Sequence, residues 1–154
     1  IYCPKNTYVS IPMTFIKLGY EIYFTDEKWN EYYNITNKVI DAAVLWRANS
    51  YIPNTLMSIS FQYRKHLNLG RGGMILCQTL EEYNTLKAMS YDGRDLSISP
   101  WPLQNINTIG YHYYMTPETA QFGLSKLPKA IDSIPKYGTY IDYPDLSKMD
   151  VFNK

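Results

Sequence analysis

The sequence predicts an α/β domain with a mostly parallel sheet and flanking helices. Two observations predict it: short apolar runs bounded by turn residues, and longer segments that carry helix-start signals. The predicted strands are 22–24, 39–40, 56–60 and 74–77, and the predicted helices are 8–18, 80–90 and 117–127. With 154 residues, of which 45% are hydrophobic, the chain is long enough for one domain with a core.

The helix predicted at 117–127 has the clearest start signal. Thr116 is suited to the N-cap, and Pro117 suits the first helical position. Ala120, Leu124 and Leu127 follow at i, i+4 and i+7 and form one apolar face, which we expect to lie in the core. Thr79 stands where it would cap the helix at 80–90 in the same way.

The apolar run at 39–40 ends on a carboxylate, Asp41, which is followed by two alanines. This pattern is typical of the end of a buried parallel strand. An acid at the carboxyl end of a strand in an open α/β sheet faces the crevice where ligands bind. The alternative is that Asp41 caps the segment that follows.

A serine, a lysine and a glycine-rich turn follow one another closely at residues 60–73. Ser60 offers a hydroxyl that can bind a phosphate, and Lys65 offers an amine that can form a Schiff base with an aldehyde. The glycines that follow allow a tight turn beside such a group. This arrangement is typical of a pyridoxal 5′-phosphate (PLP) site, although a surface lysine before an ordinary glycine turn gives the same pattern.

Together these segments resemble the DegT/DnrJ/StrS-type PLP-dependent sugar aminotransferases of fold type I. The blocks that carry the resemblance occur in family order over roughly residues 4–130: NTYVS at 6–10 with LGYEIYFTD at 18–26, VIDAA at 39–43, SFQYRKHLNLGRGG at 60–73 and GYHYYMTPETAQFGLSKL at 110–127. The resemblance implies part of a fold type I large domain and transfer of an amino group from an amino acid, with glutamate expected, to a keto sugar carried on a nucleotide.

The resemblance also assigns roles to five residues. Lys65 would carry PLP and act as the general base, and Asp41 would pair with the pyridine nitrogen. Ser60 would bind the phosphate and Tyr8 would stack on the ring. His112, which replaces the family's asparagine, would reach the phosphate in the neighbouring subunit, so the resemblance implies a homodimer.

The chain departs from the family pattern in three further places. Val44 stands where the family usually has a polar residue. Only the twelve residues 27–38 separate Asp26 from Val39, too few for the strand and crossover helix that the family inserts there. The resemblance also leads us to expect that the chain begins after the segment that carries the family's phosphate-binding loop. We therefore expect a partial or shortened member of the family.

The predicted organisation is an incomplete aminotransferase-like domain at 1–128, followed by an extended tail or the stub of a C-terminal domain at 129–154. A rival to catalysis is a remnant that keeps the fold and binds a sugar nucleotide or a protein. The paired catalytic candidates Lys65 and Asp41 favour the enzyme, whereas the short link at 27–38 favours the remnant.

Composition argues against other classes of protein. A net charge of +1 with scattered basic residues argues against nucleic-acid or membrane binding. The two cysteines form no CxxC motif, and two histidines give no recognisable metal cluster, so we expect no metal and a cytoplasmic setting. The sixteen tyrosines are open to two interpretations: an aromatic platform for sugars or bases, or ordinary half-buried residues.

Overall fold

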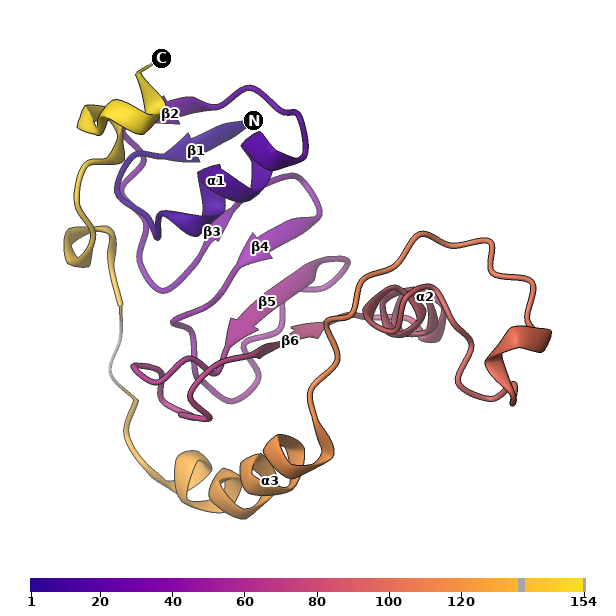
Figure 1. The fold of residues 1–154 in the computed structure, drawn as a ribbon. Helices are drawn as coiled ribbons and strands as arrows, with labels where there is room; N and C mark the ends of the chain where they lie inside the picture. The colour runs from indigo at the N-terminus through magenta and orange to yellow at the C-terminus, as the bar shows by residue number, and fades with distance from the viewer. Residues whose placement is uncertain (136–137, 154) are drawn as a thin grey trace.

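The protein is described by a computed structural model that covers residues 1–135 and 138–153, and it is an α/β fold with two sheets and three α-helices (Figure 1). The elements follow in the order β1 (Tyr2–Pro4), α1 (Ser10–Lys17), β2 (Tyr23–Thr25), β3 (Tyr33–Asn34), β4 (Val39–Asp41), β5 (Leu56–Ser60), β6 (Gly73–Leu76), α2 (Leu80–Ser90) and α3 (Pro117–Asp132). Short 3-10 turns lie at Trp101–Leu103, Tyr140–Asp142, Leu146–Lys148 and Asp150–Phe152.

The larger sheet is mixed, so the expected mostly parallel sheet is not confirmed. Its order is β3-β4-β5-β6, and only the central pair β4-β5 is parallel. The connection between β3 and β4, residues 35–38, is short, which explains why this edge of the sheet is antiparallel. A parallel neighbour needs a crossover of a dozen residues or more, whereas a short connection can only return antiparallel. The smaller sheet pairs β1 with β2 in parallel through α1.

The two predicted caps are present. The side chain of Thr79 accepts a hydrogen bond from the backbone N–H of Glu82, and the Glu82 side chain completes a capping box at the start of α2. At α3, the Thr116 hydroxyl accepts from the backbone N–H of Thr119. This helix continues past Pro128 to Asp132, five residues beyond the predicted end.

The apolar face predicted for α3 is wrong at Leu124, which is 69% exposed. The helix instead buries Gly123 and Ala130, with Leu127 packed alongside. These positions have the same i, i+4, i+7 spacing but are shifted by three residues. Gly123 allows a close approach, because a Cβ there would lie 2.9 Å from a methyl group of Leu69.

Two small clusters form the core. One joins β4 and β5 through Ile40, Ala42, Leu45 and Met57, which are at most 3% exposed. The other joins the loop after β5 to α3 through Phe61, Leu67 and Ala130. The second cluster therefore fixes the loop that contains Lys65 against a helix more than 50 residues away in sequence.

The C-terminal residues 138–153 pack back on the start of the chain. The backbone N–H of Leu146 donates to the carbonyl of Lys5 at 2.8 Å, and the Leu146 side chain is 1% exposed. Phe152 packs edge-on against Phe24 in β2. Figure 1 accordingly shows the C-terminus beside β2. The division of the chain at residue 128 stays a prediction.

Candidate functional site

Four of the five predicted site residues line one cavity of about 860 Å³. Tyr8 comes from the segment between β1 and α1, Asp41 from the end of β4, Ser60 from the end of β5, and Lys65 from the loop that follows. The parallel pairing of β4 with β5 places Asp41 opposite Ser58, so both strands end at the same edge of the sheet. The cavity lies at this edge, as the carboxyl-end rule for parallel strands predicts.

Lys65 lies in a tight turn that the following glycines close. Its backbone N–H donates to the carbonyl of Gln62 at 2.8 Å. The ends of the loop are joined by hydrogen bonds from Phe61 to Gly72 and from Tyr63 to Gly70. Both glycines have a positive φ, +87° at Gly70 and +95° at Gly72, which side-chain-bearing residues rarely adopt.

Partial burial lowers the pKa of the Lys65 amine from its ordinary value of 10.5. The negative charge of Asp41 opposes this effect, and the positive charge of Arg64 adds to it. A lower pKa increases the neutral fraction of the amine near neutral pH, and the neutral amine is the form that acts as a nucleophile or as a base.

Asp41 is the last residue of β4, and its Oδ1 accepts a hydrogen bond from the backbone N–H of Ala43 at 2.9 Å. The carboxylate therefore does cap the local turn, as one of the two interpretations of the sequence expected, and it also lines the cavity. Its cross-strand neighbour is Tyr33. Burial, and then the Asp41 charge, raise the pKa of Tyr33, whose hydroxyl lies 2.7 Å from that of Thr7.

Ser60 and Tyr8 differ in how firmly they are held. The Ser60 hydroxyl oxygen accepts a hydrogen bond from the backbone N–H of Gln62 at 3.3 Å, which leaves its own proton to donate. Tyr8 is 56% exposed and lies just before the start of α1, where its carbonyl oxygen accepts a hydrogen bond from the backbone N–H of Ile11. One residue can thus donate to an anion, and the other offers an open aromatic ring.

His112 does not line this cavity. It lies beyond α2, where its Nδ1 is 3.0 Å from a carboxylate oxygen of Asp92 and its ring packs edge-on against Tyr114. The role expected of it, contact with the phosphate in a neighbouring subunit, stays a prediction.

Several residues that line the cavity were not identified from the sequence: Glu31, Tyr33, Trp46, Arg64, His66 and Tyr143. His66 shows why they were missed. Its Nε2 lies 2.8 Å from the carbonyl oxygen of Ala130, and its ring packs on Trp46. The two partners lie 64 and 20 positions from His66 in the sequence, so no local motif predicts these contacts.

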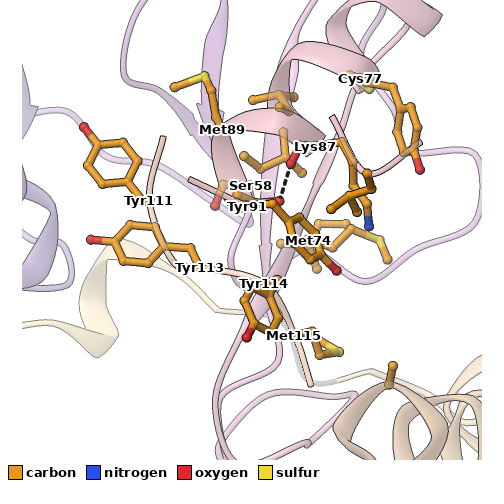
Figure 2. A pocket seen from close by; sticks show the side chains of 18 of the residues that line it. Ser58, Met74, Cys77, Lys87, Met89, Tyr91, Tyr111, Tyr113, Tyr114 and Met115 are labelled. Carbon is orange, nitrogen blue, oxygen red and sulfur yellow. Dashed lines mark hydrogen bonds between the residues drawn. The ribbon is translucent and has the colours of Figure 1, made fainter. Parts of the chain in front are cut away.

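A second, larger hollow of about 1130 Å³ lies between β6, α2 and residues 111–115, and Figure 2 shows the tyrosines that gather there. Tyr91 stacks on Tyr114 with ring centres 4.7 Å apart, and Tyr111 stacks on Tyr113 at 5.1 Å. None of Tyr8, Asp41, Ser60 and Lys65 lines this hollow. Its walls are mainly aromatic and aliphatic, and the four candidate residues Tyr8, Asp41, Ser60 and Lys65 all line the smaller cavity.

Residues 1–135 and 138–153 contain neither a cluster suited to a metal ion nor a helix suited to a membrane. No group of three or more His, Cys, Asp or Glu side chains is placed to hold a metal ion. No helix within the same residues has the length and apolar character needed to cross a membrane.

Comparison with known proteins identifies the family. The family model described as the DegT/DnrJ/EryC1/StrS aminotransferase family matches residues 50–136, more than half of the chain. The matched range includes Ser60 and Lys65, whereas Tyr8 and Asp41 precede it. Searches of curated proteins and of solved structures found no match. The chain therefore belongs to the DegT/DnrJ/EryC1/StrS aminotransferase family, whose members depend on PLP.

Proposed function

We propose that this chain is a PLP-dependent aminotransferase that moves an amino group from an amino acid, with glutamate as the expected donor, to a keto sugar linked to a nucleotide. The observation that carries the proposal is the convergence of Lys65, Asp41 and Ser60 on one cavity. These residues come from two strand ends and a loop, and a solvated surface lysine would need none of the others.

The residues of the cavity suit PLP. When bound, PLP supplies an aldehyde that takes up the amino group and a ring that accepts the electrons of a broken Cα–H bond. Lys65 would attach to the aldehyde, and Asp41 would hold a proton on the ring nitrogen. Ser60 would donate its hydroxyl proton to the phosphate, Tyr8 would lie on the ring, and Arg64 lines the same cavity as a cation for the phosphate.

Within this arrangement Lys65 has two tasks. Its amine attaches as a nucleophile and, once free, holds and moves a proton at Nζ. Both tasks need the neutral amine, and the lowered pKa of Lys65 favours that form. An ionised Asp41 can only accept hydrogen bonds, and an acceptor is what a protonated ring nitrogen needs as its partner.

The proposal includes a homodimer in which His112 of each chain serves the phosphate in its neighbour. The exposure of His112 and its distance from its own cavity support this arrangement, because the side chain is accessible to a second copy. Asp92, at 3.0 Å, would orient the imidazole.

Borohydride reduction in the presence of PLP, followed by peptide mapping, tests the proposal. We expect a stable pyridoxyl label on Lys65 and a loss of that label in Lys65→Met. Lys38 and Lys87 serve as internal comparisons, because Lys38 pairs with Glu82 at 2.7 Å and Lys87 lies over the ring of Tyr91. A label on either of them in place of Lys65, or on no lysine, would show that this cavity is not a PLP site and would favour the non-catalytic remnant.

A further inference from the structure

The carbonyl oxygen of Ala130 joins the two loops next to the main candidates of the cavity. Ala130 is among the last four residues of α3, whose carbonyl oxygens lack an intrahelical donor. Nε1 of Trp46 donates to this oxygen at 3.1 Å, and Nε2 of His66 lies 2.8 Å from it. Trp46 lies in the loop that follows Asp41, and His66 comes directly after Lys65 in the loop that follows β5.

These three residues, Ala130, Trp46 and His66, are called the Ala130 clamp below. A carbonyl oxygen can only accept, so Nε2 of His66 carries the hydrogen and donates it. The rings of Trp46 and His66 pack with their centres 5.5 Å apart, and Ala130 is only 7% exposed. Hydrogen bonds in such a shielded place are stronger than in water, so the clamp can hold two loops to one point of α3.

Apolar packing reinforces the clamp on the side of Lys65. Phe61 and Leu67, which flank Lys65 in its loop, form one buried cluster with Ala130. The side chains of Trp46 and His66 both line the cavity. The wall of the cavity and the loop with Lys65 therefore share one support.

Lys65 and Asp41 interact electrostatically in this cavity. Partial burial lowers the pKa of Lys65, and the negative charge of Asp41 acts against this by raising it. The effect of one charge on another depends on the distance between them. The response of Lys65 to the charge of Asp41 therefore reports whether the two loops keep their relative position.

We propose that His66 is a positioning residue, which acts through the Ala130 clamp to hold Lys65 in its place relative to Asp41. The inference rests on the proposed function, in which Lys65 and Asp41 act on the same cofactor. His66 needs no contact with that cofactor, because it acts on the loop that carries Lys65.

Competitive acetylation of the full chain without PLP tests the clamp. At about pH 8 the labelling of a lysine follows its neutral fraction, and the exposed Lys28 is the internal reference. In the wild type we expect Asp41→Asn to raise the labelling of Lys65 by about twofold or more, because a charge that stabilises the ammonium form is removed. In His66→Asn the same change should have almost no effect, because the loop is released and the two groups are no longer coupled.

His66→Gln is the matched control. The amide nitrogen of glutamine is as many bonds from Cα as Nε2 of histidine, so it can donate to the same carbonyl, whereas the asparagine amide is one bond shorter. His66→Gln should therefore keep the wild-type response to Asp41→Asn. If His66→Asn fails to fold, Trp46→Phe removes the other donor, keeps a ring beside His66 and should also weaken the response.

Three results would overturn the inference: no response of Lys65 to Asp41→Asn in the wild type, an equal response in a folded His66→Asn, or a response lost equally in His66→Gln. Because the experiment uses no PLP, its outcome is separate from the borohydride test. The expected responses with no pyridoxyl label on Lys65 would reject the proposed function and leave the clamp. A label on Lys65 without these responses would reject the clamp alone.

Discussion

Lys65 combines two effects that the sequence does not show together. Partial burial lowers its pKa, and the opposing charges of Asp41 and Arg64 then adjust it. The charged amine is therefore less stable in the folded protein than in the unfolded chain. A residue with this property costs stability at neutral pH, which is common for groups whose pKa suits a chemical task.

The pH dependence of stability tests this property. Lys65→Met should be at least as stable as the wild type at pH 7, because it removes a partly desolvated charge. Above the folded-state pKa the wild-type lysine is neutral when folded but still protonated when unfolded, so wild-type stability rises with pH up to about 10.5. The advantage of the variant should therefore shrink as the pH approaches that value in urea unfolding experiments.

Lys28→Met, at an exposed position, is the control and should show no such trend. A difference between Lys65→Met and wild type that stays constant or grows with pH would contradict the assigned shift in the pKa of Lys65.

At the level of elements, the stability of α2 depends mainly on the capping box at its N-terminus. None of its residues is buried, so packing adds little to its stability. Thr79 and Glu82 satisfy two backbone donors at its start, and Glu82 also pairs with Lys38 at 2.7 Å. These contacts join the wall of the tyrosine-lined hollow to the sheet.

Thr79→Ala should destabilise α2 by about 1 kcal/mol, the usual effect of losing an N-cap side chain. Hydrogen exchange of the α2 amides is the appropriate measurement, because the effect is local. Thr79→Ser keeps the hydroxyl and should exchange like the wild type. Equal protection in the alanine variant would show that the Lys38–Glu82 pair alone holds the helix.

The link at 27–38 forms an element that the sequence did not predict. Two residues of it, Tyr33 and Asn34, form β3 and pair with the last two residues of β4. A two-residue strand has no period from which to recognise it. Its effect on the site is nevertheless large, because Tyr33 becomes the neighbour of Asp41 and Glu31 enters the cavity wall.

At the level of the whole molecule, the C-terminal segment holds the first residues of the chain in place. Leu146 is buried, and its N–H bonds the carbonyl of Lys5, three residues before Tyr8. Asn6 donates from its side chain to the carbonyl of Tyr143 at 2.9 Å, and Tyr143 itself lines the cavity. The two ends of the chain therefore build one side of the candidate site.

Leu146→Ala should cost about 2–5 kcal/mol of unfolding free energy, as for other buried leucines. It should also weaken PLP binding, because the segment carrying Tyr8 and Tyr143 loses its anchor. Urea unfolding and a spectroscopic PLP titration measure the two effects. Val151→Ala, at a position 46% exposed, should change neither by much. Unchanged PLP binding in a destabilised Leu146→Ala would separate the C-terminal segment from the site.

Local chemistry determined most of what was predicted correctly from the sequence. The start of α2 depends on a hydroxyl and the start of α3 on a hydroxyl and a proline, and β5 occupies the predicted residues 56–60. The family resemblance likewise depended on local blocks, and the family match at 50–136 confirms it. Such features were accessible because each depends on residues within a few positions of one another.

Only the tertiary structure decided which side of α3 is buried, the direction of the strands at the sheet edges and the full lining of the cavity. Leu124 is exposed because the loop around Leu69 meets the helix at Gly123, a contact 54 positions away in sequence. Glu31, His66 and Tyr143 reach the cavity through contacts of the same kind. Their positions depend on how separate elements pack, and no periodicity or spacing within one segment encodes that packing.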